Sequence, residues 1–278
     1  MLGIEGGVAM QIKVLGPVEA KVNGRSVTPT AAKPRQILAL LALHSGQVVS
    51  VPTLIEELWG DRPPRSARTT LQTYILQLRK LIGDALSSAG AAGAKEVLVT
   101  RYGGYLLDVP PEAVDVHEFE RLGRAGQQAS DVEDHASAAR LLRQALDMWR
   151  GPAVVDVRPG MPLGIEVVRL EEARLGLLEA RIDAELRMGK HKALLSELSV
   201  LTVQNPMNEN LCAQYMVSLF RAGRQWQALD AFKALRNTLI EELGVEPSSR
   251  LQALQHAILT SDPRLDSAET RQLQRLLA

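Results

Sequence analysis

The sequence predicts two domains of different class: a mixed α/β domain followed by an all-α domain. Runs that alternate apolar and polar residues, the pattern of half-buried strands, occur near residue 10 and again near residue 100. Three segments with helical spacing of apolar residues lie between them. After residue 114 the pattern is helical almost throughout, and glycine and proline separate the segments. We place the domains at 10–110 and 115–262, with a disordered extension at 1–9 and a C-terminal tail at 263–278.

The composition predicts a cytoplasmic protein. Hydrophobic residues make up 46% of the 278 residues, enough to give each domain a core. No uncharged apolar stretch reaches the roughly 18 residues of a membrane span. The opening MLGIEGGVA lacks the basic and then apolar order of a secretion signal. The single cysteine, Cys212, has no partner for an internal disulfide, and its helical neighbourhood favours a core position.

The first domain is expected to begin with a small antiparallel sheet. From Met10 the text MQIKVLGPVEAKVNGRSV alternates apolar and polar residues. Asn23-Gly24 separates two such runs, and this dipeptide favours a hairpin because both turn positions need positive φ. Three helices follow: the first opens at Lys33-Pro34, the second is capped by Ser50, and the third is capped by Ser66.

The third helix, Ser66–Ile82, has two faces of different character. Helical spacing predicts a buried face of Leu71, Tyr74, Ile75, Leu78 and Ile82. The other side carries basic, amide and hydroxyl groups and no acid: Arg68, Thr69, Gln72, Thr73, Gln77, Arg79 and Lys80. Arg and Gln have the geometry to read base edges, and Lys and Thr suit phosphates. This face predicts a DNA-recognition helix, although a solvated helix face can have the same composition.

A hairpin is expected after the third helix. A Gly/Ala/Ser-rich loop at 84–94 leads to VLVTRYGGYLL at 97–107, which predicts two short strands around a glycine turn. Arg101 and Tyr102 lie near its tip, within reach of a phosphate or the minor groove. Strands, three helices and a terminal hairpin in this order predict a winged helix. The charge balance agrees, because residues 1–110 hold 12 Lys/Arg against 8 Asp/Glu and the remainder hold 20 against 24.

The second domain is expected to consist of stacked helix pairs. Its helical segments are predicted at 117–129, 135–149, 163–188, 191–204, 208–222, 224–242 and 248–259. RMGKHKALL from Arg187 and RAGRQWQAL from Arg221 lie 34 residues apart, the period of tetratricopeptide repeats. Stacked pairs leave a concave surface. That surface is either a binding or dimerisation platform or part of a body that only supports the first domain.

Motifs of catalysis are missing from the sequence. Gly189-Lys190 lacks the upstream glycine of a phosphate-binding loop, and HExxH, CxxC and GxSxG do not occur. The five histidines are scattered along the chain. We therefore expect a protein that is not an enzyme and that needs no cofactor and no metal.

Several stretches carry a family resemblance. KPRQILALLALHSGQVVSVPTLIEELWG (33–60), ARTTLQTYILQLRKLIG (67–83) and TRYGGYLL (100–107) resemble the OmpR-type winged helix and, more closely, the Streptomyces antibiotic regulatory protein family. The opening from Met10 also matches that family. GPAVVDV from Gly151 and EELGVEPSSRLQALQHAIL from Glu241 resemble its bacterial transcriptional activator domain. Larger relatives carry an additional ATPase or phosphopeptide-binding module, so the chain looks like a short-form member.

These observations together predict a sequence-specific DNA-binding transcriptional activator, associated with the nucleoid. Early in the third helix, Arg68, Thr69, Gln72 and Thr73 are expected to face the major groove, with Gln77 beside them. The phosphate contacts are expected to come from Lys33, Arg35, Arg79, Lys80 and Arg101, with Tyr102 on the hairpin.

The resemblance also implies partners. It points to double-stranded promoter DNA with direct repeats near the −35 region of an antibiotic gene cluster, bound by a dimer or by tandem protomers. RNA polymerase holoenzyme, through its sigma factor or alpha subunit, would touch the turn before the third helix, where the candidates are Trp59, Asp61, Arg62 and Arg65. A different class of function is a helical-repeat adaptor or ligand sensor whose winged helix binds proteins. Salt-dependent DNA binding would distinguish the two.

Overall fold

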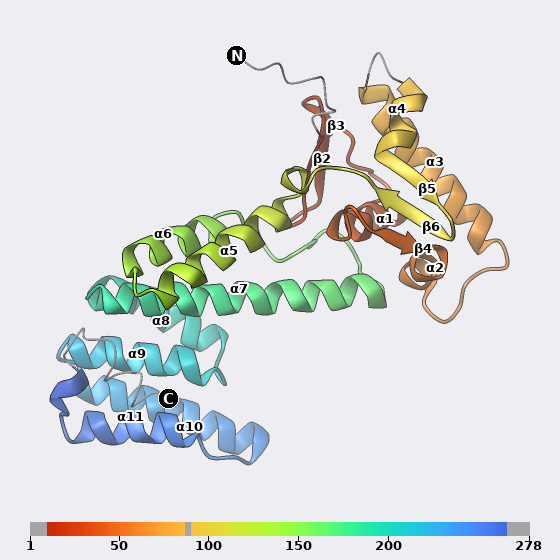
Figure 1. Cartoon of the computed structure of the whole chain (residues 1–278). Helices are drawn as coiled ribbons and strands as arrows, with labels where there is room; N and C mark the ends of the chain where they lie inside the picture. The colour runs from red at the N-terminus through yellow and green to blue at the C-terminus, as the bar shows by residue number, and fades with distance from the viewer. Residues whose placement is uncertain (1–9, 87–89, 266–278) are drawn as a thin grey trace, which may run out of the picture. The chain divides into compact units, whose positions relative to one another are not determined.

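The computed structural model describes residues 10–86 and 90–265, so the predicted extension at 1–9 and residues 266–278 of the predicted tail lie outside it. The chain forms two compact units. Unit 1 runs up to Gly123 and takes in Gln144–Leu175, and unit 2 comprises Arg124–Arg143 and the chain from Gly176 onward. Mixed α/β structure followed by helices confirms the predicted fold class (Figure 1).

Unit 1 begins with the expected antiparallel sheet. Strands β1 (Met10–Lys13), β2 (Glu19–Val22) and β3 (Arg25–Ser26) are paired in that order. Asn23 and Gly24 have φ of 50° and 79°, so the hairpin turn has the positive φ that the sequence predicted at both positions. The alternate side chains Ile12, Ala20 and Val22 are buried, so one face of the sheet packs into the core.

Three helices form the body of the winged helix: α1 (Ala32–Leu43), α2 (Val51–Trp59) and α3 (Ala67–Ala85). Ser50 caps α2 as predicted, because its side chain accepts a hydrogen bond from Thr53 N at 3.2 Å. The cap predicted at Ser66 was wrong. The backbone of Ser66 has ψ of 13°, outside the extended region of a capping residue, and its side chain makes no capping bond.

A second sheet, in the order β4-β6-β5, holds the wing. Strands β5 (Leu98–Arg101) and β6 (Gly104–Leu107) form the predicted hairpin, and β4 (Val48–Ser50) is a third strand that was not predicted. The loop predicted at 84–94 was partly wrong, because a helix, α4 (Gly90–Val97), follows α3 and contacts it and β5. The alanine-rich sequence of this segment favours a helix, and contact with α3 is available to it in the folded protein.

The chain that follows the wing folds back to complete unit 1. After the 3-10 turn η1 (Pro111–Ala113), α5 (Asp115–Asp131) starts with Asp115, whose carboxylate accepts hydrogen bonds from Val14 N at 2.8 Å and Leu15 N at 3.2 Å. Burial raises the pKa of Asp115 despite these two bonds. Asp156 accepts from Val18 N at 2.8 Å and pairs with Arg35 Nη1 at 2.8 Å.

Unit 2 contains helix pairs. It takes in parts of α5, α6 (His135–Leu146) and α7 (Met161–Arg187), and all of α8 (His191–Gln204), α9 (Glu209–Arg221), α10 (Gln225–Leu243) and α11 (Ser249–Leu259), with η2 (Pro263–Leu265) after them. The two repeat copies occupy equivalent places. Gly189 and Gly223 each follow a helix and have φ of 76° and 75°, so both copies end a helix in the same way.

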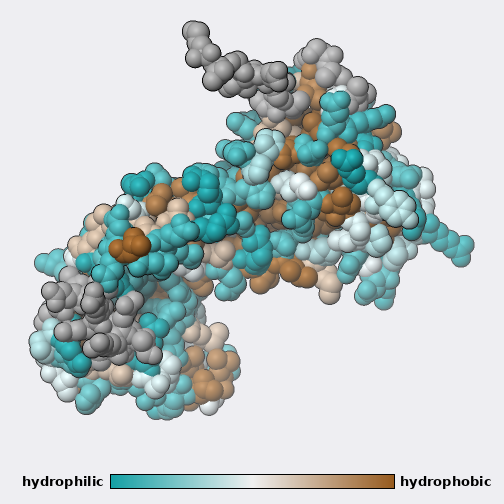
Figure 2. Space-filling view, in the orientation of Figure 1, coloured by the Kyte–Doolittle hydropathy of each residue, from teal (hydrophilic) through white to brown (hydrophobic). Residues whose placement is uncertain are grey.

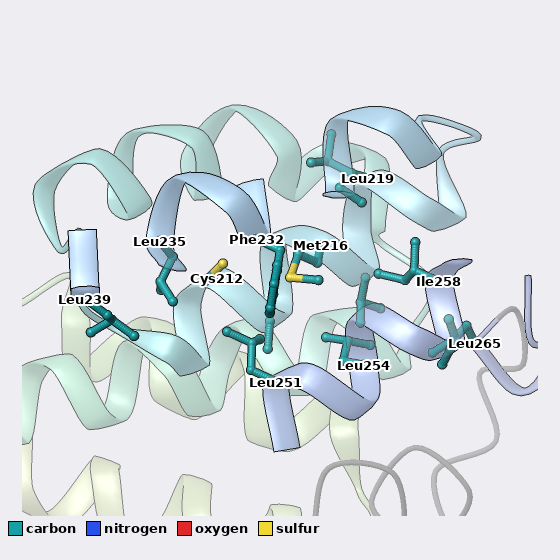
Figure 3. Packing of buried hydrophobic residues seen from close by; sticks show 14 residues of the cluster. Cys212, Met216, Leu219, Phe232, Leu235, Leu239, Leu251, Leu254, Ile258 and Leu265 are labelled. Atoms are coloured by element: carbon teal, nitrogen blue, oxygen red, sulfur yellow. The ribbon is translucent and has the colours of Figure 1, made fainter. Parts of the chain in front are cut away.

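The core of unit 2 lies between α9, α10 and α11. Met216, Phe232 and Leu254 meet at its centre, and Cys212 lies beside them with 3% of its surface exposed (Figure 3). The predicted core position of Cys212 is therefore confirmed. No helix within the described residues is both long and apolar enough to cross a membrane. The surface that faces the viewer in Figure 2 is mostly hydrophilic, with separate small hydrophobic areas.

Candidate nucleic-acid interface

Helix α3 presents a continuous exposed stripe. Ile75 and Leu78 are buried against the rest of unit 1, with 1% of each side chain exposed, so the opposite side of the helix faces solvent. The exposed residues there are Arg68, Thr69, Gln72, Thr73, Leu76, Gln77 and Lys80. From Arg68 to Lys80 two of these residues are basic and none is acidic, which is the composition that suits a polyanion, and exposed Asp84 follows one turn beyond Lys80. The structure thus brings together on one surface six of the seven predicted α3 residues.

Leu76 was missed by the sequence analysis. Its side chain is 66% exposed, and it lies between Gln72, Thr73 and Gln77 on the stripe. The signal was available, because residues three or four apart share a helix face and Leu76 follows Gln72 and Thr73 at that spacing. The sequence analysis assigned Leu76 to neither the buried nor the polar face, whereas its position places it on the polar stripe.

Arg79 connects α3 to the wing. Its Nε and Nη2 donate hydrogen bonds to Leu98 O at 2.9 and 2.7 Å, and Nη2 also donates to Thr100 Oγ1 at 2.8 Å. Three bonds from one planar guanidinium fix the orientation of β5 against the helix. Arg79 therefore positions the wing beside α3, a role that the sequence did not suggest.

The wing turn carries two further predicted residues. Arg101 is exposed and Tyr102 is fully exposed at the tip. Gly103 has φ of 78°, and its carbonyl oxygen accepts a hydrogen bond from Val51 N at 2.8 Å, which holds the tip against the start of α2. At Gly104 any Cβ would overlap the carbonyl oxygen of Val49, so only glycine allows β6 to pair this closely with β4.

Two predicted phosphate ligands on α1 are engaged within unit 1. Lys33 Nζ lies 4.4 Å from the centroid of the Trp59 ring, a cation–π contact. Arg35 donates through Nε to Pro29 O at 2.9 Å and through Nη1 to Asp156. Both side chains keep N–H groups that these contacts do not use. A phosphate could bind those remaining groups without breaking the contacts.

The turn between α2 and α3 is open to solvent. Gly60 ends α2 with φ of 58°, and Asp61, Arg62 and Arg65 are exposed on the turn that follows. Trp59 is half-buried under Lys33, so its ring is held at the base of the turn. The four residues predicted to touch a protein partner are thus neighbours on one projecting segment.

Glu57 is a second residue that the sequence did not single out. It is 2% exposed, and its carboxylate accepts hydrogen bonds from Gly160 N at 2.7 Å and Leu163 N at 2.8 Å, where α7 begins. Gln36 Nε2 donates to Glu57 Oε1 at 2.5 Å and to Glu57 O at 2.7 Å. The negative charge at the start of a helix is favourable, and it fixes the last turn of α2.

The site thus offers an exposed helix stripe, a projecting turn and a wing, which together suit binding to a groove and backbone rather than chemistry. Among the described residues, no three His, Cys, Asp or Glu side chains gather as metal ligands. Exposed Arg, Gln and Lys side chains on a rigid helix are the groups that read base edges and hold phosphates.

Two family models match the chain. Residues 25–107 match "Transcriptional regulatory protein, C terminal", and residues 114–259 match "Bacterial transcriptional activator domain". The first range covers the helices and the wing described above, and the second covers helices α5 to α11.

Similar proteins span both regions. Regulatory protein DnrI of Streptomyces peucetius is 59% identical over 92% of this chain and 94% of its own length. Transcriptional regulator RedD of Streptomyces coelicolor is 35% identical over 93% of this chain and 73% of its own length. The solved structure of Mycobacterium tuberculosis EmbR in complex with a low-affinity phosphopeptide has a TM-score of 0.86 and 29% identity, covering 98% of this chain and 69% of that chain. The chain therefore belongs to the Streptomyces antibiotic regulatory protein family, whose members are DNA-binding transcriptional activators and not enzymes.

Proposed function

We propose that the chain recognises promoter DNA by placing α3 in the major groove and the β5–β6 wing against the neighbouring backbone. The observation that carries this proposal is the exposed stripe of α3 from Arg68 to Lys80, which contains no acidic residue and is held beside the wing by Arg79. The 19 residues of α3 are about 28 Å long at 1.5 Å per residue, and an α-helix of that length fits the major groove.

Base reading falls to the first half of the stripe. The guanidinium of Arg68 suits O6 and N7 of guanine, and the amide of Gln72 suits N6 and N7 of adenine. Thr69, Thr73 and Gln77 complete the predicted reading set. Thr73 Oγ1 donates to Thr69 O at 3.1 Å, so that hydroxyl keeps its lone pairs to accept a bond from a base.

Phosphate contacts fall to the margins of the stripe. Lys80, near the C-terminal end of the stripe, and Arg101 on the wing are exposed cations, and Tyr102 is exposed beside Arg101. Lys33, Arg35 and Arg79 stay in the proposed set, although their internal partners limit each to the N–H groups that remain. Their first role is to position Trp59, the segment before α1, and the wing.

We further propose that the target is a pair of direct repeats near the −35 region of an antibiotic gene cluster. Two protomers, as a dimer or in tandem, would occupy the repeats in the cytoplasm at the nucleoid. The projecting turn with Trp59, Asp61, Arg62 and Arg65 would then contact the sigma factor or alpha subunit of RNA polymerase. Its exposed charges of both signs suit a polar protein interface.

A titration with fluorescent promoter duplexes tests the DNA-binding proposal in the full chain. Arg68→Ala should weaken binding to the preferred duplex by roughly tenfold or more and relax the preference at one position. Lys80→Ala should weaken binding to all duplexes alike and lower the salt slope by about one. Arg250→Ala, an exposed arginine at the start of α11, is the matched control and should change neither. Binding without salt dependence, or an Arg68→Ala variant equal to the control, would refute the proposal.

Transcription in a reconstituted system tests the polymerase contact separately. Asp61→Ala with Arg62→Ala should leave duplex affinity unchanged, because neither residue lies on the stripe, and should abolish activation. If activation persists at saturating protein, the turn is not the contact.

A further inference from the structure

Leu76 occupies the centre of the stripe that faces away from the core. At about 100° per residue, Thr69 and Lys80 lie within about 40° of Leu76 around the helix axis, and Gln72 and Thr73 lie on either side. Its side chain is 66% exposed, whereas the core residues Ile75 and Leu78 on the same helix are 1% exposed. An exposed leucine is common on protein surfaces. Leu76 differs in its place, at the middle of an otherwise polar, cationic face.

Helix stability does not require leucine at this position. Lys, Arg, Gln and Glu stabilise a helix nearly as well as leucine and would be better hydrated. Packing does not require it either, since two thirds of the side chain faces solvent. The isobutyl group of Leu76 is therefore free to contact whatever the exposed face of α3 binds.

The major groove offers one apolar group to such a side chain. Among the four bases only thymine presents a methyl group there, on C5, next to the O4 acceptor. The neighbours of Leu76 on the stripe, Gln72 and Gln77, can hydrogen-bond to adjacent base edges, so the isobutyl group between them would lie at the depth of the bases.

We propose that Leu76 is a specificity-determining residue that selects thymine at one position of the DNA site by contact with its 5-methyl group. This inference rests on the proposed DNA-binding function and adds a reader to the predicted set. It differs from the polar readers in one testable respect: replacing thymine by uracil removes the methyl group and leaves every hydrogen-bonding group in place.

The test begins by selecting a binding site for the full chain from a random duplex library. Affinity is then measured by fluorescence anisotropy on the selected duplex and on copies in which one thymine at a time is replaced by uracil. Burial of one methyl group is expected to give about a fourfold loss at one thymine. Leu76→Ala should remove the difference between thymine and uracil at that position and keep the rest of the preference.

Leu81→Ala is the matched control. Leu81 is also an exposed leucine of α3, 37% exposed, but it lies about 140° around the helix from Leu76. This variant should keep the full response to uracil. The melting temperature of Leu76→Ala should equal that of the parent chain, because this side chain is mostly exposed. Leu81→Ala removes a side chain that is more covered, so its binding is measured well below its own melting temperature.

The outcomes separate this inference from the function on which it rests. If the parent chain selects no duplex, the DNA-binding proposal fails and the role of Leu76 with it. If the parent chain selects a site but no thymine responds to uracil, the inference about Leu76 alone is overturned. The same holds if Leu76→Ala keeps the response, or if Leu81→Ala loses it.

Discussion

Replacing Glu57 with alanine should destabilise unit 1, although Glu57 lies outside the proposed DNA surface. The substitution removes the acceptor of two backbone N–H groups at the start of α7, those of Gly160 and Leu163. Leu163 is fully buried, and a buried donor without a partner costs about 1–3 kcal/mol. Gly160 is half-buried, so water can take over part of its bond. Gln36 Nε2 retains its bond to Glu57 O. The sum is a loss of about 2–4 kcal/mol.

Thermal unfolding followed by circular dichroism measures this loss. At roughly 2–4 °C per kcal/mol for domains of 150–250 residues, a loss of about 3 kcal/mol lowers the Tm by roughly 6–12 °C. Glu56→Ala is the matched control, because Glu56 precedes it on the same helix and is exposed; its Tm should stay within about 1–2 °C of the parent. If Glu57→Ala melts within 2 °C of Glu56→Ala, the carboxylate does not hold the start of α7 and the reasoning is wrong.

Three further outcomes are expected. Gly104→Ala should cost roughly 1–3 kcal/mol in a urea titration and weaken DNA binding, because its Cβ would overlap the backbone of Val49; unchanged binding would contradict this. Cys212 should resist a thiol reagent at pH 8 until the chain unfolds, since burial raises the pKa of its thiol to about 12. Because the folded chain holds this proton more tightly than the unfolded chain, the contribution of Cys212 to the free energy of unfolding is present below about pH 9 and is lost as pH rises towards 12. Phe232→Ala should cost about 3–5 kcal/mol of unfolding free energy because Phe232 lies at the centre of the unit 2 core, and a loss under 1 kcal/mol would show that the core re-forms.

Local patterns predicted most of the elements. Apolar spacing placed α8 at the residues observed and the other helices of the second domain within a few residues, because these helices bury one stripe each. Asn23-Gly24 predicted its hairpin because the backbone conformation it needs is local. Strand β4 escaped prediction because it has three residues and exists only through its pairing with β6.

The candidate site was predictable in its composition and less so in its connections. Exposure of Arg68, Gln72 and Lys80 follows from helical spacing alone. The partners of Arg79 do not, because Leu98 O lies 19 residues along the chain and meets the guanidinium only after the wing has folded. Glu57 is a similar case, since its partners are more than 100 residues away and nothing in the text VPTLIEELWG separates it from the solvent-exposed Glu56 beside it.

Gly160 and Asp156 lie far along the chain from the winged helix but hydrogen-bond to it, through Glu57 and Arg35. These contacts limit which segments of the protein can be exchanged with those of a relative. A chimera that exchanged only the segment up to the wing would leave Glu57 without the helix start it caps, Arg35 without its carboxylate, and Val14 and Leu15 without Asp115. Grafting a new DNA preference therefore calls either for changes on the α3 surface alone or for a transplant that also carries Asp115, Asp156 and Gly160 with the winged helix.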